Sequence, residues 1–373
     1  MKMKWNLVLF FCVFFLFGSS LYFGIPRDKY MAWDLLKEMI PIPGISGQEG
    51  QVADYIVDSL ESKLSNSVRI NRDEMHNVWF TVGDGDTHIM FVAHTDELGL
   101  VVTGISEHGL LQVSGKGGFF PEMYEGHAVV VHTNRGPVYG VVSPRSGYLL
   151  RDGIEQPFNL KEIRIYLGTD SVKSVEELGI RIGDQITIRK KVVELTEDLL
   201  CTRAVDDRAG CAALLAAVMN LDLAAVRGKT VTFAWDVQEE TGLIGAAELA
   251  KKINPDYVIP VDTFVSSDGP FESKRFAMTP LGKGAVIRAI DSSNIAPYKE
   301  WQKIWNIAQK HNIPVQVGNT RGGNDGSVFL AGGATNIPIS WPGTYSHSFI
   351  EKINRKDLEA LTKLISAVVK DFE

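Results

Sequence analysis

Cysteine is scarce in this chain of 373 residues, which contains only three. Three cysteines are too few for a disulfide framework, and no Cys-x-x-Cys pair occurs. An excess of positive charge is also lacking, because 38 lysines and arginines stand against 45 acidic residues and give a net charge of −7. This balance excludes an overall basic field that would hold nucleic acid.

Several familiar catalytic motifs are absent as well. The chain has no Gly-x-Ser-x-Gly elbow, no His-Glu-x-x-His pair and no P-loop. The run Gly115-Lys116-Gly117-Gly118 lacks the partner positions of a dinucleotide-binding fingerprint and is interpreted as a turn. A serine hydrolase of the elbow type and a P-loop nucleotidase are therefore not expected.

One feature that the average composition hides is an uncharged block of 22 residues, Trp5 to Pro26, of which 16 are apolar. Lys2 and Lys4 precede it, as in a signal peptide with a basic start and an apolar core. Its length also suffices to cross a bilayer of roughly 30 Å. Residues 1–26 are therefore predicted to be a signal peptide or an N-terminal membrane anchor. Both alternatives place the rest of the chain outside the cytoplasm, exported or anchored.

The remaining chain alternates between helical and strand patterns, which predicts an α/β fold with a mixed sheet. Ser46 and Glu49 have the spacing of a capping box ahead of an amphipathic helix, and Asp357 is a plausible cap for the closing helix. Further helices are expected at 28–39, 208–221, 246–252 and 301–311, and strands at 68–71, 78–82, 89–93, 231–236 and 257–261.

The stretch from Leu98 to Val193 has a different character, with short strand patterns, Gly-rich turns and no long helical period. It predicts a small β domain inserted into the α/β domain. The resulting partition is a catalytic domain in two parts, 27–97 and 198–373, interrupted by an inserted β-barrel domain at 98–197.

Acidic residues and histidines gather where predicted strands and helices end. His94 and Asp96 follow the apolar strand 89–93 with a spacing that lets a carboxylate hold one nitrogen of a metal-binding imidazole. Asp206 and Asp207 stand at the entry to a helix, where they fit either a ligand site or a helix cap. Taken singly, each of these features is also compatible with a purely structural role.

Two adjacent glutamates, Glu239 and Glu240, follow the strand 231–236 at the sheet edge where open α/β proteins place their active sites. Adjacent acids repel each other, so a nearby cation would explain them. Asp262 ends the next strand and His347 follows the apolar stretch 337–341. Together these side chains are the ligand mixture of a two-zinc hydrolytic site.

These segments resemble the tetrahedral-aminopeptidase and glutamyl-aminopeptidase family of dinuclear zinc metallopeptidases. The resemblance extends from about Trp33 to the C-terminus. It rests on the segments IPGISGQEG, HTDELG, AVDDRAG, QEETGLIGA, VDTF and YSHSFIE, in that order. It implies a zinc-peptidase catalytic domain, with the inserted barrel serving as a dimerisation domain.

The resemblance also implies roles for individual residues. Glu239 would be the general base and Asp96 would orient a ligand. Two divalent ions per subunit, Zn²⁺ or alternatively Co²⁺ or Mn²⁺, would be shared by five ligands: His94, Asp206, Glu240, Asp262 and His347. The substrates would be peptides, cleaved at their N-terminal residue, and the subunits would form homodimers or larger homo-oligomers.

Two departures from the family pattern concern substrate preference. The arginine that the family commonly carries before the tyrosine of its last motif is missing from Pro342-Gly343-Thr344-Tyr345. Asn324 occupies the usual threonine position of a Gly-Gly-Thr-Asp run. A related dinuclear-zinc amidase or carboxypeptidase-like hydrolase stays open, as does a membrane-tethered binding protein without turnover. A glycosidase is disfavoured, because its two catalytic carboxyl groups must face each other across roughly 5–9.5 Å, which adjacent glutamates do not do.

Other reactive side chains show no ligand-like context. Cys201 and Cys211 are expected to be small buried residues, with a disulfide between them left open. Surface or turn positions are expected for the remaining histidines: His76, His88, His108, His127, His132 and His311.

Overall fold

The structure is a computed structural model, and it describes residues 31–64, 68–145, 159–223, 226–269 and 278–373. The predicted N-terminal segment, residues 1–26, lies outside the described residues. Within the described part of the chain, no helix is both long enough and apolar enough to cross a membrane.

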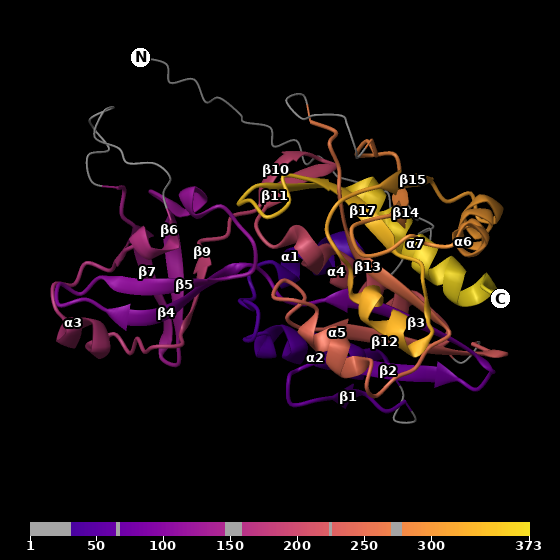
Figure 1. Ribbon diagram of the computed structural model, residues 1–373, viewed down its shortest axis with the longest axis horizontal. Helices are drawn as coiled ribbons and strands as arrows, with labels where there is room; N and C mark the ends of the chain where they lie inside the picture. The colour runs from indigo at the N-terminus through magenta and orange to yellow at the C-terminus, as the bar shows by residue number, and fades with distance from the viewer. Residues whose placement is uncertain (1–30, 65–67, 146–158, 224–225, 270–277) are drawn as a thin grey trace, which may run out of the picture.

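A large mixed sheet forms the body of the molecule, and the predicted α/β fold with an inserted barrel is confirmed (Figure 1). Its central strands β12, β3, β13 and β17 run parallel, whereas β2 and β18 pair antiparallel with the outer members of this set. The described strands of this sheet are β1 (Asn71–Arg72), β2 (Val78–Gly83), β3 (Thr87–His94), β10 (Val193–Thr196), β11 (Leu199–Thr202), β12 (Lys229–Asp236), β13 (Tyr257–Val265), β14 (Ala285–Ile290), β15 (Val315–Asn319), β16 (Thr335–Asn336), β17 (Ile339–Thr344) and β18 (Glu351–Asn354).

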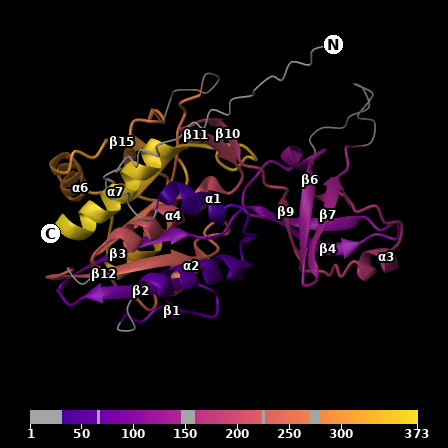
Figure 2. The same ribbon diagram turned by 180° about the vertical axis from the view of Figure 1, so that it is seen from behind.

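Helices cover both faces of this sheet. The alternation of side chains along β3 explains why, since Ile89, Phe91 and Ala93 join one apolar core whereas Met90 and Val92 join another. Helices α1, α4 and α7 lie over the first face (Figure 2), and α5 packs on the second. The helices of this body are α1 (Ala32–Met39), α2 (Gly50–Lys63), α4 (Val205–Asn220), α5 (Ile244–Leu249), α6 (Tyr298–Lys310) and α7 (Arg355–Asp371).

Two predicted helix caps are wrong. Helix α2 begins only after Glu49, and Ser46 instead donates its hydroxyl hydrogen bond to Asp96, at 2.6 Å. The N-cap of α7 is Asn354, whose side chain accepts from the Lys356 amide. Asp357 accepts from the amides of Gly282 and Gly284. In both cases a distant partner outcompetes the local one.

The inserted segment forms a closed barrel beside the sheet, with its own apolar core. Its strands are β4 (Gly99–Ile105), β5 (Leu111–Lys116), β6 (Ala128–Thr133), β7 (Gly136–Val142), β8 (Ile165–Tyr166) and β9 (Gln185–Ile188), and α3 (Val172–Glu177) accompanies them. Figure 1 shows α3 at the end of the barrel remote from the sheet. The barrel strands end at Ile188, since β10 and β11, residues 193–202, join the large sheet rather than the barrel.

Candidate active site

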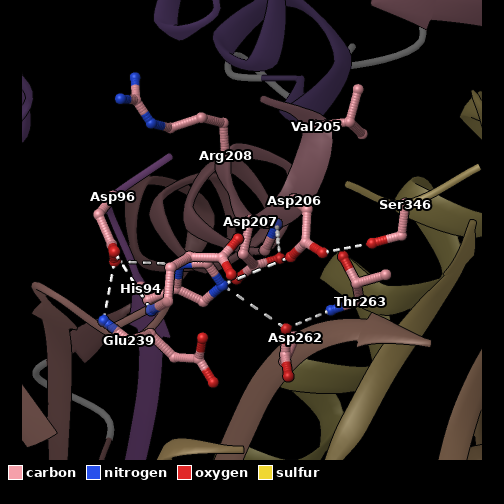
Figure 3. Close-up of polar contacts among 12 residues, drawn as sticks. His94, Asp96, Val205, Asp206, Asp207, Arg208, Glu239, Asp262, Thr263 and Ser346 are labelled. Atoms are coloured by element: carbon pink, nitrogen blue, oxygen red, sulfur yellow. Dashed lines mark hydrogen bonds and ion pairs between the residues drawn. The ribbon is translucent and has the colours of Figure 1, made fainter. Parts of the chain in front are cut away.

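His94 ends strand β3, and a buried aspartate holds its ring. The Nδ1 atom of His94 lies 3.3 Å from Asp96 Oδ1. Asp96 also accepts hydrogen bonds from the Ser46 hydroxyl and from the amides of Glu239, at 3.0 Å, and Glu240, at 3.2 Å. Burial would raise the pKa of Asp96, but the hydrogen bond and charge of His94 lower it. One aspartate therefore fixes both the imidazole and the turn that carries the two glutamates (Figure 3).

The other ring nitrogen of His94 faces two more carboxylates. Its Nε2 atom lies 3.4 Å from Asp206 Oδ1 and 3.8 Å from Asp262 Oδ1. One ligand atom from each of these three residues falls within 4.8 Å of the others, and all three residues are buried. His94, Asp206 and Asp262 are called the first ligand group below.

A second group of the same kind shares Asp206. His347 Nε2 lies 3.3 Å from Glu240 Oε2 and 3.7 Å from Asp206 Oδ2, the oxygen that also accepts the Ser346 hydroxyl at 2.7 Å. The ligand atoms of Asp206, Glu240 and His347 again lie within 4.8 Å of one another. These three residues are the second ligand group. The structure thus brings all five predicted ligands together, with Asp206 between the two groups.

Glu239 belongs to neither ligand group but lines the same cavity, whose volume is about 720 Å³. Burial raises the pKa of Glu239 well above its usual range, against the lowering effect of His94. Phe119, Phe120 and Met123 of the inserted segment form an apolar wall of this cavity, and Arg321 adds a polar position. The cavity is therefore built from both parts of the chain.

The electrostatics of the cluster suit bound cations. Burial and the neighbouring acids raise the pKa of Glu240. Burial also raises the pKa of Asp262, although Arg288 opposes it. Burial would lower the pKa of His94, but its hydrogen bonds to Asp206 and Asp96 raise it. Buried carboxylates that lack sufficient positive charge are costly to ionise, and divalent ions at the two ligand groups would supply it.

Four supporting residues were not identified from the sequence. Ser46 was assigned to a helix cap, and its contact with Asp96 spans 50 positions. Arg288 is buried, and its guanidinium donates to Asp262 Oδ2 at 3.0 Å, leaving Oδ1 on the side of His94. No periodicity marks such contacts. Only the isolated polar residue in the apolar strand β14 could have drawn attention to Arg288.

The other two supporting residues are Arg203 and Glu351. They form a buried ion pair, with 2.6 Å between Nη1 and Oε1. Glu351 accepts the amides of Asp206, at 3.1 Å, and His347, at 3.1 Å. The pair therefore ties together the backbone at Asp206, which both groups share, and the backbone at His347 of the second group. Glu351 lies in the YSHSFIE segment of the family resemblance, which implied no role for it.

The other histidines and the two cysteines lie outside the ligand groups. Cys201 and Cys211 are both free and buried, so the disulfide left open from the sequence is absent. His132 bonds to Thr187 and His311 to Asp371. Among the described residues, no further group of three or more potential ligands occurs.

Two ligand groups that share a carboxylate, beside a buried glutamate, are the arrangement expected of a metal-dependent hydrolase. A model of the family described as M42 glutamyl aminopeptidase matches residues 77–364. The lysyl aminopeptidase of Pyrococcus furiosus is 30% identical over 91% of this chain and 97% of its own. The glutamyl aminopeptidase of Lactococcus lactis is 27% identical over 90% of this chain and 95% of its own.

Solved structures agree with these relatives. The TET1 peptidase of Pyrococcus horikoshii superimposes with a TM-score of 0.83 and 33% identity, covering 91% of this chain and 99% of that one. The chain belongs to the M42 glutamyl aminopeptidase family. It is an aminopeptidase, a hydrolase that acts on peptide bonds.

Proposed function

We propose that the protein is a dinuclear zinc aminopeptidase that removes N-terminal residues from peptides, with Glu239 as general base. One ion would be held by the first ligand group and one by the second. The observation that carries this proposal is the position of Asp206, whose two oxygens face different ligand groups. Histidine and carboxylate ligands suit Zn²⁺, and Co²⁺ or Mn²⁺ are alternatives.

Bound divalent ions would polarise the scissile carbonyl and lower the pKa of a water molecule toward neutrality. The protein supplies the proton transfers. Glu239, whose pKa is raised by burial, is suited to take up a proton at its carboxylate and to deliver it to the leaving amine. Asp96 keeps Nδ1 of His94 engaged, so that Nε2 stays directed at the first ligand group.

Glu239→Gln tests this assignment. The variant keeps the shape of the side chain but cannot accept a proton, so turnover should fall by roughly 10²–10⁴. Because Glu239 lies outside both ligand groups, the variant should retain two metal ions per chain. Glu248→Gln on α5 is a matched control, since Glu248 pairs only with surface lysines among its described contacts and should leave activity unchanged.

Activity is measured on aminoacyl-anilides and, in parallel, on N-acylated amino acids, and metal content by elemental analysis. Dialysis against a chelator should abolish activity, and added Zn²⁺ should restore it. Full activity of Glu239→Gln would refute its role as the base. A preference for N-acylated substrates would instead favour the amidase alternative.

Assembly and location are parts of the same proposal. The Pyrococcus horikoshii relative is described as assembling into a tetrahedron or a large octahedral shell. By analogy, the present chain is proposed to form homodimers through its barrel, or larger homo-oligomers. The apolar segment 5–26 supports an extracytoplasmic location, exported or anchored. N-terminal sequencing and fractionation of the expressed protein, together with its mass in solution, test both points.

A further inference from the structure

A histidine that binds metal through Nε2 needs an acceptor for the hydrogen on Nδ1. For His347 the structure provides that acceptor from the inserted segment. His347 Nδ1 lies 2.7 Å from the carbonyl oxygen of Gly118. Gly118 directly follows the Gly117 turn after β5 of the barrel, whereas His347 lies between β17 and β18 of the large sheet. The orientation of one predicted ligand therefore depends on a contact between the two parts of the molecule.

The backbone around His347 does not hold itself in place. Tyr345 and His347 both have positive φ values, 65° and 64°. Such a backbone conformation is unfavourable for residues other than glycine and persists only where the surrounding structure enforces it. The side chain of His347 is also 42% exposed, in contrast to 2% for His94. His347 therefore depends on contacts from outside its own segment more than the buried His94 does.

Phe349, two residues after His347, provides such a contact with the barrel. It packs against the barrel core, its ring lying 4.8 Å from that of Tyr124 in an edge-to-face arrangement and 5.3 Å from that of His127. Tyr124 in turn contacts Phe119, at 5.1 Å, and Phe119 is the neighbour of Gly118. A closed chain of contacts therefore runs from His347 through the barrel rings and back to the carbonyl that holds His347.

The Gly117 turn lies close to the second ligand group. Gly117 has a φ of 80°, and a methyl group there would overlap Leu98 and lie 3.2 Å from Cβ of Glu240. The turn is thus packed against a member of the second ligand group. A displacement of Phe349 would therefore disturb His347 directly and through the turn.

We propose that Phe349 is a positioning residue through which the inserted barrel maintains the second ligand group. The inference rests on the proposed two-ion centre. It assigns the barrel a role within each subunit, in addition to its proposed role in assembly. Loss of the Phe349 ring should weaken ion binding at the second ligand group and spare the first, because no described contact links Phe349 to His94 or Asp262.

The test is Phe349→Ala in the full chain, dialysed against a series of zinc buffers, with the number of ions per chain measured at each free Zn²⁺ concentration. Loss of an outer-shell partner typically weakens metal binding by 10–100-fold. We expect the first ion to bind as in the unmodified protein and the second to bind 10–100-fold more weakly. Val175→Ala is the matched control, because Val175 lies in the same barrel core but on α3, away from the site.

Each outcome decides between specific alternatives. Two ions bound with unchanged affinities in Phe349→Ala would overturn the inference. So would loss of both ions, or an equal loss in Val175→Ala, since either would indicate general destabilisation. If Phe349→Ala does not fold, Phe349→Leu, which fills part of the same space, must show a smaller but selective loss. An unmodified protein that binds fewer than two ions would refute the proposed centre, and the inference with it.

Discussion

The buried ion pair of Arg203 and Glu351 offers the sharpest test of how the site is held, through the substitution Arg203→Met. The two side chains are only 4% and 2% exposed. Arg203 also donates to the carbonyl oxygens of Ser348, at 3.3 Å, and Leu98, at 3.1 Å. Methionine fills similar space but leaves the Glu351 carboxylate buried without its cation. The metal-free protein should therefore lose stability.

The size of this loss follows from two considerations. Removal of one partner of a buried ion pair costs about 3–5 kcal/mol of unfolding free energy. The lower end of this range applies where Glu351 takes up a proton at neutral pH, because burial already raises the pKa of Glu351 to about 7 with Arg203 in place. The lost bonds to the two carbonyls account for about 1 kcal/mol each within this loss. The expected loss is therefore about 3–5 kcal/mol.

The assay is denaturant unfolding of metal-free protein, so that ion binding does not contribute to the stability. Arg355→Met is the matched control, because Arg355 pairs with Asp198 near the surface and should lose less than about 1 kcal/mol. The double variant Arg203→Met with Glu351→Gln should recover part of the loss, since it removes the unpaired carboxylate. The reasoning is refuted if Arg203→Met costs no more than Arg355→Met.

Two further predictions concern His132 in the barrel and Ser46, which donates a hydrogen bond to Asp96. Burial lowers the pKa of His132 to about 4, so the unfolded chain binds more protons than the folded one between pH 6.5 and 4. The free energy of unfolding should therefore fall as the pH falls through this range. After allowance for the partial exposure of the ring, the expected fall is about 1–2 kcal/mol. His132→Gln should lack this part of the fall in thermal unfolding curves, and parallel curves would contradict the assignment. Ser46→Ala should lose about 1–2 kcal/mol of unfolding free energy, because the buried Asp96 carboxylate loses its 2.6 Å bond. Ser59→Ala on α2 should lose less, and an equal loss would show that Ser46 has no special role.

Much of the fold was predictable because it is encoded in local patterns. The apolar runs of β3 and β12 indicated strands of an α/β fold, and the change of pattern after Leu98 indicated a separate β unit. Its end was not predictable in the same way. The segment 193–202 has strand character like its neighbours, and only its pairing with β18 assigns it to the large sheet.

The candidate site divides along the same line. The ligands followed from their place after predicted strands together with a family resemblance, and the structure brings them together. The residues that hold them did not follow, because their contacts span long stretches of sequence. Ser46 matched a local capping pattern, yet a buried carboxylate 50 positions away is the stronger partner. The carbonyl of Gly118 carries no side-chain signal at all.

The adjacent acids Asp206 and Asp207 show how the chain resolves an ambiguity that the sequence left open. A helix cap and a ligand site were alternatives, and in the structure Asp207 makes a capping contact whereas Asp206 belongs to both candidate ligand groups. Asp206 and Asp207 have non-helical backbone angles within the start of α4. Asp207 accepts from the Gly210 amide, at 3.0 Å, as a capping residue does, and also from the indole of Trp341, at 2.9 Å. Asp206 is thereby left to direct its two oxygens at His94 and His347, because a regular helix would have rotated successive side chains by about 100°. The irregular turn thus lets Asp207 cap the start of α4 while Asp206 lies between the two candidate ligand groups.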